Sequence, residues 1–396
     1  MEITGLARRA ASLSPTAAAP PRSGMIGFDS GHAFPGILPD LRRAAALALG
    51  EYRHETLQYS ERAGLPEMRE WIAAHMCRDG SPVTADEIAV VNGAKHGIEL
   101  LCRLLLDEGD TIVVTAPTYF TSIPIFRSFG ARFIEVEQDE EGIDVEAIKA
   151  ALDSVRRDGS RPPKFIYDIP DFHNPTGITT SRRRREALVA LAARHSIPVI
   201  EDSPYREVRF EGEVLPTLRS LASGGSVISV GTFAKLVAPG LRIGWIAAPV
   251  DLIRRILLLK ADGGSSPLVQ RILLEFFRAD GLPAHIETVR ATYRDHRDAM
   301  VTSLRRHLPT VEFTIPSGGY YVWLRLPEGV DGEIIADRAA SEGVSVIAGH
   351  RFFAADATYP RNRPSPRNNV RVAYSHASPT EIEEGVKRLA RAFVDR

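Results

Sequence analysis

Three side chains with complementary chemistry lie close together in the middle of the chain. Thr232 supplies a hydroxyl, Lys235 an amine and Arg242 a guanidinium, all within eleven residues of a segment rich in small side chains. A hydroxyl and a guanidinium suit a phosphate dianion, because arginine offers paired donors and threonine adds another. A desolvated lysine between cationic neighbours has a lowered pKa and can act as a nucleophile. A solvated loop lysine is the alternative, and this segment alone leaves both open.

A second candidate segment is Asn92-Gly93-Ala94-Lys95-His96-Gly97, between the apolar run Ile88–Val91 and a helical stretch. A helix N-terminus with small residues presents free N–H groups to an anion. Lys95 adds positive charge there or points outward. Strand–glycine–helix junctions are also common as plain turns, so this segment is weak evidence by itself.

Two further polar groups follow apolar strand-like runs. Asn174 lies in a turn-forming Asn-Pro-Thr-Gly sequence after the run Lys164–Ile169, and Asp202 and Tyr205 follow the run Ile197–Glu201. Ligands of α/β proteins bind at the carboxyl ends of the strands. A helix cap or an ordinary loop acid is the simpler interpretation of Asp202.

The elements that must position these groups alternate between strand and helix. Short runs rich in Ile and Val are typical of strands that are buried on both faces, and helical stretches such as Arg182–His195 separate several of them. The pattern predicts an α/β fold with a largely parallel sheet covered on both sides. All four polar segments then fall at carboxyl ends of strands. The predicted strands are Ile88–Val91, Thr111–Thr115, Arg132–Val136, Lys164–Ile169, Ile197–Glu201, Ser226–Val230 and Ile243–Ala247.

The pattern changes beyond about Ser266. Long helices are predicted over 268–307, an antiparallel strand pair over 311–326, a loop over 351–367, a strand over 370–374 and a closing helix over 380–394. We therefore expect three parts. Residues 1–45 form an N-terminal arm and part of the small domain, 46–275 form the large domain, and 276–396 form a smaller α+β domain.

Composition excludes several classes of function. The 396 residues carry 49 basic and 50 acidic side chains, a net charge of -1, which gives no support to nucleic-acid or membrane binding. No apolar run could span a bilayer. Cys77 and Cys102 match no metal-binding spacing and are expected to be small buried hydrophobes in a reducing compartment.

The tract Arg182–Arg185 is expected to be a solvated helix start rather than a binding patch. The first two dozen residues superficially resemble a transit peptide, but a loosely docked arm and a cytoplasmic protein are the expectation.

As a set, the motifs resemble those of the class I/II aminotransferases of pyridoxal-phosphate fold type I. The residues in them are most similar to those of the aminoadipate/kynurenine branch. The matching stretches run from about Ile26 to the C-terminal helix. They are Gly-Thr-Phe-Ala-Lys-(x)3-Pro-Gly-Leu-Arg-(x)-Gly at 231–244, Asn-Pro-Thr-Gly at 174–177, Asp-(x)2-Tyr at 202–205, Tyr59 with 64–69, the aromatic segment 116–120 and the late arginine strand 369–375.

The resemblance implies a role for each matching residue in binding pyridoxal 5'-phosphate. Lys235 would form a Schiff base with the cofactor and later shuttle the substrate proton, and Asp202 would pair with the pyridine nitrogen. Asn174 and Tyr205 would hydrogen-bond the phenolate oxygen, and Tyr119 would stack on the ring.

The resemblance also implies which groups hold the charged ends of the ligands. The cofactor phosphate would be held by Thr232, Arg242 and the Gly93-Ala94-Lys95 turn. Tyr59 would reach in from a second subunit, which makes a homodimer the expected active unit. Arg371 would bind the substrate α-carboxylate, helped by Asn174 and the Gly31 backbone.

Some positions depart from the family pattern and leave substrate choice open. Ala234 stands where many relatives have Ser, His173 where Gln is frequent, and Lys95-His96 where amides are common. Tyr320, Tyr321 and Trp323 are expected mainly in a packed strand core. Alternatively, one of these rings lines the side-chain pocket together with His32 or Phe34.

The expected activity is transfer of an amino group from an L-amino acid to a 2-oxo acid, such as 2-oxoglutarate or pyruvate. A lyase or another enzyme of the same fold is the main rival, because one fold hosts many reactions. A specialised aminotransferase for an unusual amino acid, such as one with a guanidino group, is also compatible. An effector-binding regulator domain would need a DNA-binding module before the fold, and only about 25 residues precede the matched region.

Overall fold

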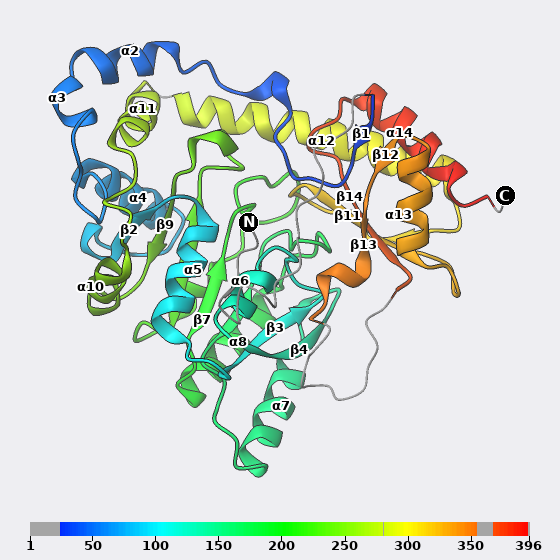
Figure 1. Ribbon diagram of the computed structural model, residues 1–396, viewed down its shortest axis with the longest axis horizontal. Helices are drawn as coiled ribbons and strands as arrows, with labels where there is room; N and C mark the ends of the chain where they lie inside the picture. Colours follow the sequence, from blue (N-terminus) through cyan, green and yellow to red (C-terminus); the bar gives the residue numbers. More distant parts are fainter. Residues whose placement is uncertain (1–23, 280, 355–366, 395–396) are drawn as a thin grey trace, which may run out of the picture.

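The computed structural model describes residues 24–279, 281–354 and 367–394. The predicted N-terminal arm up to residue 23 and most of the predicted loop over 351–367 lie outside these ranges. Two sheets, of eight and four strands, organise the described chain, and a third has only two strands (Figure 1).

The larger sheet has eight strands in the spatial order β2-β9-β8-β7-β6-β3-β4-β5. The pairings β8–β7, β7–β6, β6–β3 and β3–β4 are parallel, and β9 and β5 pair antiparallel to their neighbours. Six strands, including β2, therefore end at the same edge. The bounds are β2 Ile88–Val91, β3 Thr111–Ala116, β4 Arg132–Asp139, β5 Gly142–Ile143, β6 Ile166–Asp168, β7 Val199–Asp202, β8 Val227–Thr232 and β9 Gly244–Ala247.

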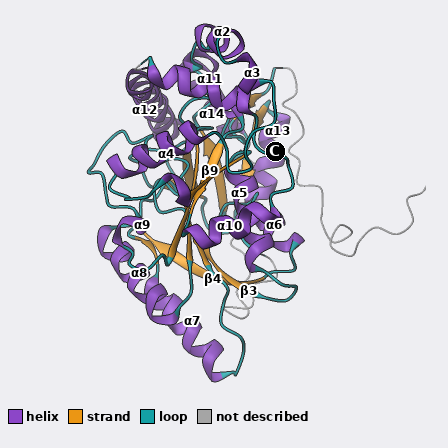
Figure 2. Cartoon of the chain, turned by 90° about the vertical axis from the view of Figure 1, so that its left-hand side faces the viewer, coloured by secondary structure: helices purple, strands orange, loops and turns teal. Residues whose placement is uncertain are grey.

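Helices cover both faces of this sheet, and the strands alternate between two cores accordingly (Figure 2). In β3, Ile112 and Val114 belong to one buried cluster and Val113 to another. Each core therefore takes every second side chain, which explains the apolar runs in the sequence. Helices α5 (Ala94–Leu105), α6 (Ile123–Ser128) and α10 (Val250–Leu259) cover one face, and α7 (Val145–Arg157), α8 (Arg182–His195) and α9 (Leu218–Leu221) cover the other.

A third buried cluster lies at the β2 edge of the sheet. There Ile88 and Val90 pack against apolar residues of α4 (Pro66–Arg78) and α11 (Pro267–Arg278). Helices α2 (Arg42–Gly50) and α3 (Arg53–Thr56) lie beside α11 (Figure 1).

The smaller sheet has the order β10-β11-β14-β13 and is antiparallel throughout. Its strands are β10 Glu312–Phe313, β11 Tyr321–Arg325, β13 Ile347–Ala348 and β14 Asn369–Ala373. Helix α12 (Gly281–His307) runs from the region of α11 to this sheet, where it packs against α14 (Pro379–Arg391); α13 (Gly332–Ser341) lies beside them (Figure 1). Near the start of the described chain, β1 (Ile26–Gly27) pairs with β12 (Val344–Ser345), so the N-terminal segment packs with the smaller unit. The short 3-10 helices are η1 Pro35–Ile37, η2 Ala85–Glu87, η3 Pro239–Leu241 and η4 Gly349–Phe352.

These observations confirm the predicted α/β fold, and helix α8 has the bounds expected from the sequence. Two details of the prediction are wrong. Cys77 is exposed, because it lies on the outer side of α4 while Met68, Ile72 and Met76 face the core. Arg185 is fully buried rather than solvated, because it binds a buried acid, Asp171. None of the described helices is long and apolar enough to cross a membrane.

Candidate active site

A cavity of about 390 Å³ opens at the carboxyl edge of the large sheet. It gathers nine of the side chains that the sequence singled out, from segments that lie more than 140 residues apart in the chain. Its lining includes Ala94, Lys95, Tyr119, Asn174, Asp202, Tyr205, Thr232, Lys235 and Arg242, together with His32.

Lys235 follows β8 and turns its amine into this cavity. Its Nζ donates a hydrogen bond to the Gly31 carbonyl at 2.6 Å, and its own carbonyl accepts one from the Tyr320 hydroxyl at 2.8 Å. Burial lowers the pKa of the Lys235 amine, and the nearby cations Arg371 and Lys95 lower it further. A larger fraction of the amine is therefore neutral and nucleophilic at pH 7.

Asp202 is the last residue of β7 and has one carboxylate oxygen free to meet a ligand. Its Oδ2 accepts a hydrogen bond from the Tyr167 hydroxyl at 2.8 Å. Its Oδ1 is buried and has no hydrogen-bond partner among the described residues. Burial raises the pKa of this carboxyl to about 7. A cationic donor in the cavity would satisfy both the orphaned oxygen and the buried charge.

Asn174 and Tyr205 meet side chains of the smaller sheet. The Asn174 Oδ1 accepts a hydrogen bond from Nη1 of Arg371 at 3.1 Å, and the Tyr205 hydroxyl donates to the Tyr321 hydroxyl at 3.2 Å. The turn after β6 and the segment after β7 are thus joined to β14 and β11.

Arg371 is almost completely buried and is held in one orientation. Its Nη2 donates to the Asp29 carbonyl, and its Nε has no partner among the described groups. The rings of Phe120, Tyr321 and Phe352 surround the guanidinium at 4.1 to 5.6 Å from its Cζ atom. These rings keep water away from a cation that still has a donor to offer.

An anion-binding cup forms at the start of α5. Gly93, with φ +86°, is the N-cap, and the guanidinium of Arg242 lies so close that a Cβ atom at Gly93 would be 2.8 Å from its Nη2. Arg242 itself adopts φ +54° and donates to the Asn92 carbonyl at 3.2 Å. Thr232 ends β8 beside this cup, where its hydroxyl donates to the Ile243 carbonyl at 3.1 Å. The free N–H groups of the helix start and the guanidinium suit a phosphate.

Three further sequence candidates, Lys95, Tyr59 and Gly31, take different positions relative to this cavity. The Lys95 ammonium lies 5.8 Å from the centre of the Tyr119 ring, and burial lowers its pKa. Tyr59 is 88% exposed and lines no part of this cavity within one chain. Gly31 meets Lys235 through its carbonyl, and a Cβ atom there would be 2.1 Å from the Tyr321 hydroxyl oxygen.

Sequence reasoning missed several aromatic residues of the site. Tyr167 binds Asp202, while Phe120 and Phe352 enclose Arg371. The alternation of β6 and β7 could have placed Tyr167 on the same face of the sheet as Asp202. Of the candidate pocket residues, His32 lines the cavity, Phe34 packs against His296, and Trp323 packs against Phe352.

Comparison with known proteins agrees with this geometry. The family model of aminotransferase class I and II matches residues 23–389. The chain belongs to the class I and II aminotransferases. This aminotransferase is 33% identical to aromatic-amino-acid aminotransferase 1 of Thermococcus litoralis, over 87% of its own chain and 82% of the relative.

Two solved structures confirm the fold and the resemblance to the aminoadipate/kynurenine branch. Kynurenine aminotransferase of Pyrococcus horikoshii, in complex with PMP, superposes with a TM-score of 0.88 at 30% identity and covers 93% of this chain and 91% of that one. The α-aminoadipate aminotransferase LysN of Thermus thermophilus, with N-(5'-phosphopyridoxyl)-L-leucine, gives 0.85 at 32% identity, with coverages of 93% and 92%.

The aminotransferase is therefore a pyridoxal-phosphate-dependent enzyme of fold type I that acts on amino acids and 2-oxo acids. The residues present fit that cofactor. The cavity offers an amine at Lys235, an orphaned buried carboxylate oxygen at Asp202 and a cationic cup beside Gly93.

Proposed function

We propose that Lys235 is the covalent attachment point of the cofactor and the base that moves the substrate's Cα proton. Pyridoxal phosphate, when bound, withdraws electrons from the substrate's Cα and so makes that proton removable. The support for Lys235 is its place in the cavity and the lowered pKa of its amine, which increases the neutral fraction that can accept a proton.

Four residues would bind the cofactor ring. Asp202 would keep the ring nitrogen protonated through its free Oδ1, which is the one buried carboxylate oxygen in the cavity that has no partner among the described residues. Asn174 and Tyr205 would hydrogen-bond the phenolic oxygen, and Tyr119 would lie against the ring face. All four side chains line the same cavity.

The cup at α5 would hold the phosphate. Arg242, Thr232 and the Gly93-Ala94-Lys95 helix start supply the donors and the positive charge. Tyr59 would complete the cup from a second subunit, and its high exposure in one chain supports that proposal. The active unit would then be a homodimer, which sedimentation of the holoenzyme tests.

Arg371 would bind the α-carboxylate of the substrate together with Asn174 and the Gly31 backbone. Its unpartnered Nε and its enclosure by aromatic rings support this role. The donor would be an L-amino acid, and 2-oxoglutarate or pyruvate would be the acceptor, because both carry a carboxylate beside the oxo group.

The division into a large domain over 46–275 and a small domain over 276–396 fits this picture, with the site where the two meet. Two free cysteines support a cytoplasmic location.

A panel of single amino acids tests the proposed reaction. The holoenzyme is mixed with each L-amino acid without acceptor, and the visible absorbance of the bound cofactor is followed. Loss of that absorbance with release of the matching 2-oxo acid, and its recovery on adding 2-oxoglutarate or pyruvate, supports transamination. Release of ammonia in repeated turnovers without acceptor supports the lyase instead.

A further inference from the structure

Arg206, the residue after Tyr205, connects two carboxylates from distant parts of the chain. Its Nε and Nη2 bind Asp79, which follows helix α4, with Nη2 at 3.0 Å from Oδ1. Its Nη1 donates to Oδ2 of Asp171 at 3.2 Å. Nη2 also donates to the Leu215 carbonyl at 2.7 Å, so the planar guanidinium has contacts on three sides.

Asp171 opens the turn that carries Asn174. It is fully buried, and its carboxylate also binds Arg185 at 2.8 Å and Arg209 at 3.2 Å. Through Asp171, Arg206 therefore joins the Asn174 turn to the segment that carries Tyr205. Both of those side chains line the cavity.

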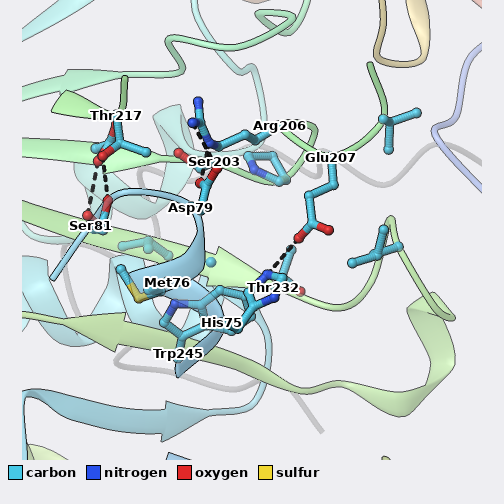
Figure 3. A pocket seen from close by; sticks show the side chains of 17 residues that line it. His75, Met76, Asp79, Ser81, Ser203, Arg206, Glu207, Thr217, Thr232 and Trp245 are labelled. Carbon is cyan, nitrogen blue, oxygen red and sulfur yellow. Dashed lines mark hydrogen bonds and ion pairs between the residues drawn. The ribbon is translucent and has the colours of Figure 1, made fainter. Parts of the chain in front are cut away.

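The next residue is anchored as well. Glu207 binds Nε2 of His75 on α4 at 2.7 Å, so two consecutive side chains after Tyr205 are attached to one helical segment (Figure 3). The pocket that these pairs border has a free volume of about 60 Å³. It has room for a few water molecules and not for a substrate. The pairs therefore act on the neighbouring backbone and not on a ligand of their own.

We propose that Arg206 is a positioning residue of the transamination reaction, which holds the Tyr205 hydroxyl at its place in the cofactor cavity. The inference rests on the proposed role of Tyr205. A phenol on a rigid segment keeps its direction, whereas a loose segment lets its hydroxyl leave the cofactor.

The structure offers a variant that removes this link and keeps the fold. In Arg206→Gln, Asp171 keeps Arg185 and Arg209, and Asp79, whose side chain is 31% exposed, can be solvated. Arg219→Gln is the matched control. The Arg219 side chain is 9% exposed against 7% for Arg206, and it binds one carboxylate, Glu87, and two backbone carbonyls at the opposite edge of the sheet.

The test compares four holoenzymes: Arg206→Gln, Arg219→Gln, Tyr205→Phe and the double variant Arg206→Gln/Tyr205→Phe. Thermal unfolding first shows that each is folded. Two quantities are then measured, kcat and the pH midpoint of the change in the cofactor's visible absorbance. We expect Arg206→Gln to shift the midpoint in the same direction as Tyr205→Phe and to lower kcat about five- to tenfold, as for one misplaced hydrogen bond. The double variant should be no worse than Tyr205→Phe, because both changes act on one hydroxyl.

Three results overturn the proposal. If Tyr205→Phe changes the spectrum but Arg206→Gln behaves like Arg219→Gln, or if the two effects add in full, Arg206 does not act through Tyr205. If Tyr205→Phe itself keeps the wild-type midpoint, the assigned role of Tyr205 fails, and the positioning role fails with it.

Discussion

The side-chain oxygen of Asn174 accepts a hydrogen bond from Nη1 of Arg371 at 3.1 Å. These residues lie 197 positions apart, one after β6 of the large sheet and the other on β14 of the small sheet. The bond therefore joins a group proposed to bind the cofactor with one proposed to bind the substrate. A shift of one sheet relative to the other would therefore change the positions of both Asn174 and Arg371.

Arg371→Lys should weaken substrate binding more than cofactor binding. Lysine lacks the planar, paired donors of the guanidinium, so it loses the two-pronged geometry toward a carboxylate while Asn174 is also bound. We expect kcat/KM for the amino acid to fall about 100-fold, which corresponds to ~3 kcal/mol. The dissociation constant of pyridoxal phosphate should change little. A fall in cofactor affinity with unchanged kcat/KM per holoenzyme would contradict the assignment.

Lys235→Ala should lower turnover by about 10³-fold or more, because proton transfer by a positioned base contributes effects of that order. The visible absorbance of covalently bound cofactor should be lost as well. Lys95→Gln is the comparison, since Lys95 is the other lysine that lines the cavity. It should weaken cofactor binding and keep most of kcat. Steady-state assays with saturating cofactor distinguish the two, and equal losses of kcat would be evidence against a special role for Lys235.

Gly31→Ala should reduce kcat because the added methyl group has no space. A Cβ atom at Gly31 would lie 2.1 Å from the Tyr321 hydroxyl oxygen and 3.3 Å from Nζ of Lys235. Tyr321→Phe removes the nearer atom, so the double variant should recover part of the loss. Gly50→Ala is the control, since nothing lies within 4 Å of its added methyl group. No recovery in the double variant would show that the methyl group acts in another way.

Asp202 should make the cofactor-free protein less stable as the pH rises. Its pKa is raised from 3.8 to about 7 by burial, so the folded state prefers the neutral carboxyl. The contribution of Asp202 to the free energy of unfolding is fully present below pH 4. It is lost between about pH 4 and pH 7, at up to about 1.4 kcal/mol per pH unit. Asp168 has a similar shift, so Asp202→Asn should remove part of the slope and not all of it. Urea unfolding of both proteins at pH 4.5 and 6.5 measures this; equal slopes would contradict the raised pKa.

The fold could be predicted because its signals are local. Most strands of the large sheet contain a short apolar run with two buried faces, and helix α8 begins with a capping Ser181 that is visible in the sequence. The four polar segments were expected at one edge, since parallel strands end together. The structure brings eight of the residues named in these segments into one cavity, together with Tyr119.

Features that depend on distant contacts could not be predicted. The aromatic enclosure of Arg371 takes rings from three separate segments, and the run of arginines at the start of α8 gives no sign that Arg185 alone binds a buried acid. Cys77 differs from Met76 only by its direction on α4. In each case tertiary packing decides whether the side chain is buried.

Borohydride reduction of the holoenzyme tests the central claim most directly. Reduction fixes the cofactor on the amine that carries it, and peptide mass spectrometry then locates the added phosphopyridoxyl group. We predict a single labelled site at Lys235, with labelling prevented by Lys235→Ala. Label on Lys95 or on any of the other four lysines, or protein that takes up no pyridoxal phosphate, would contradict the account.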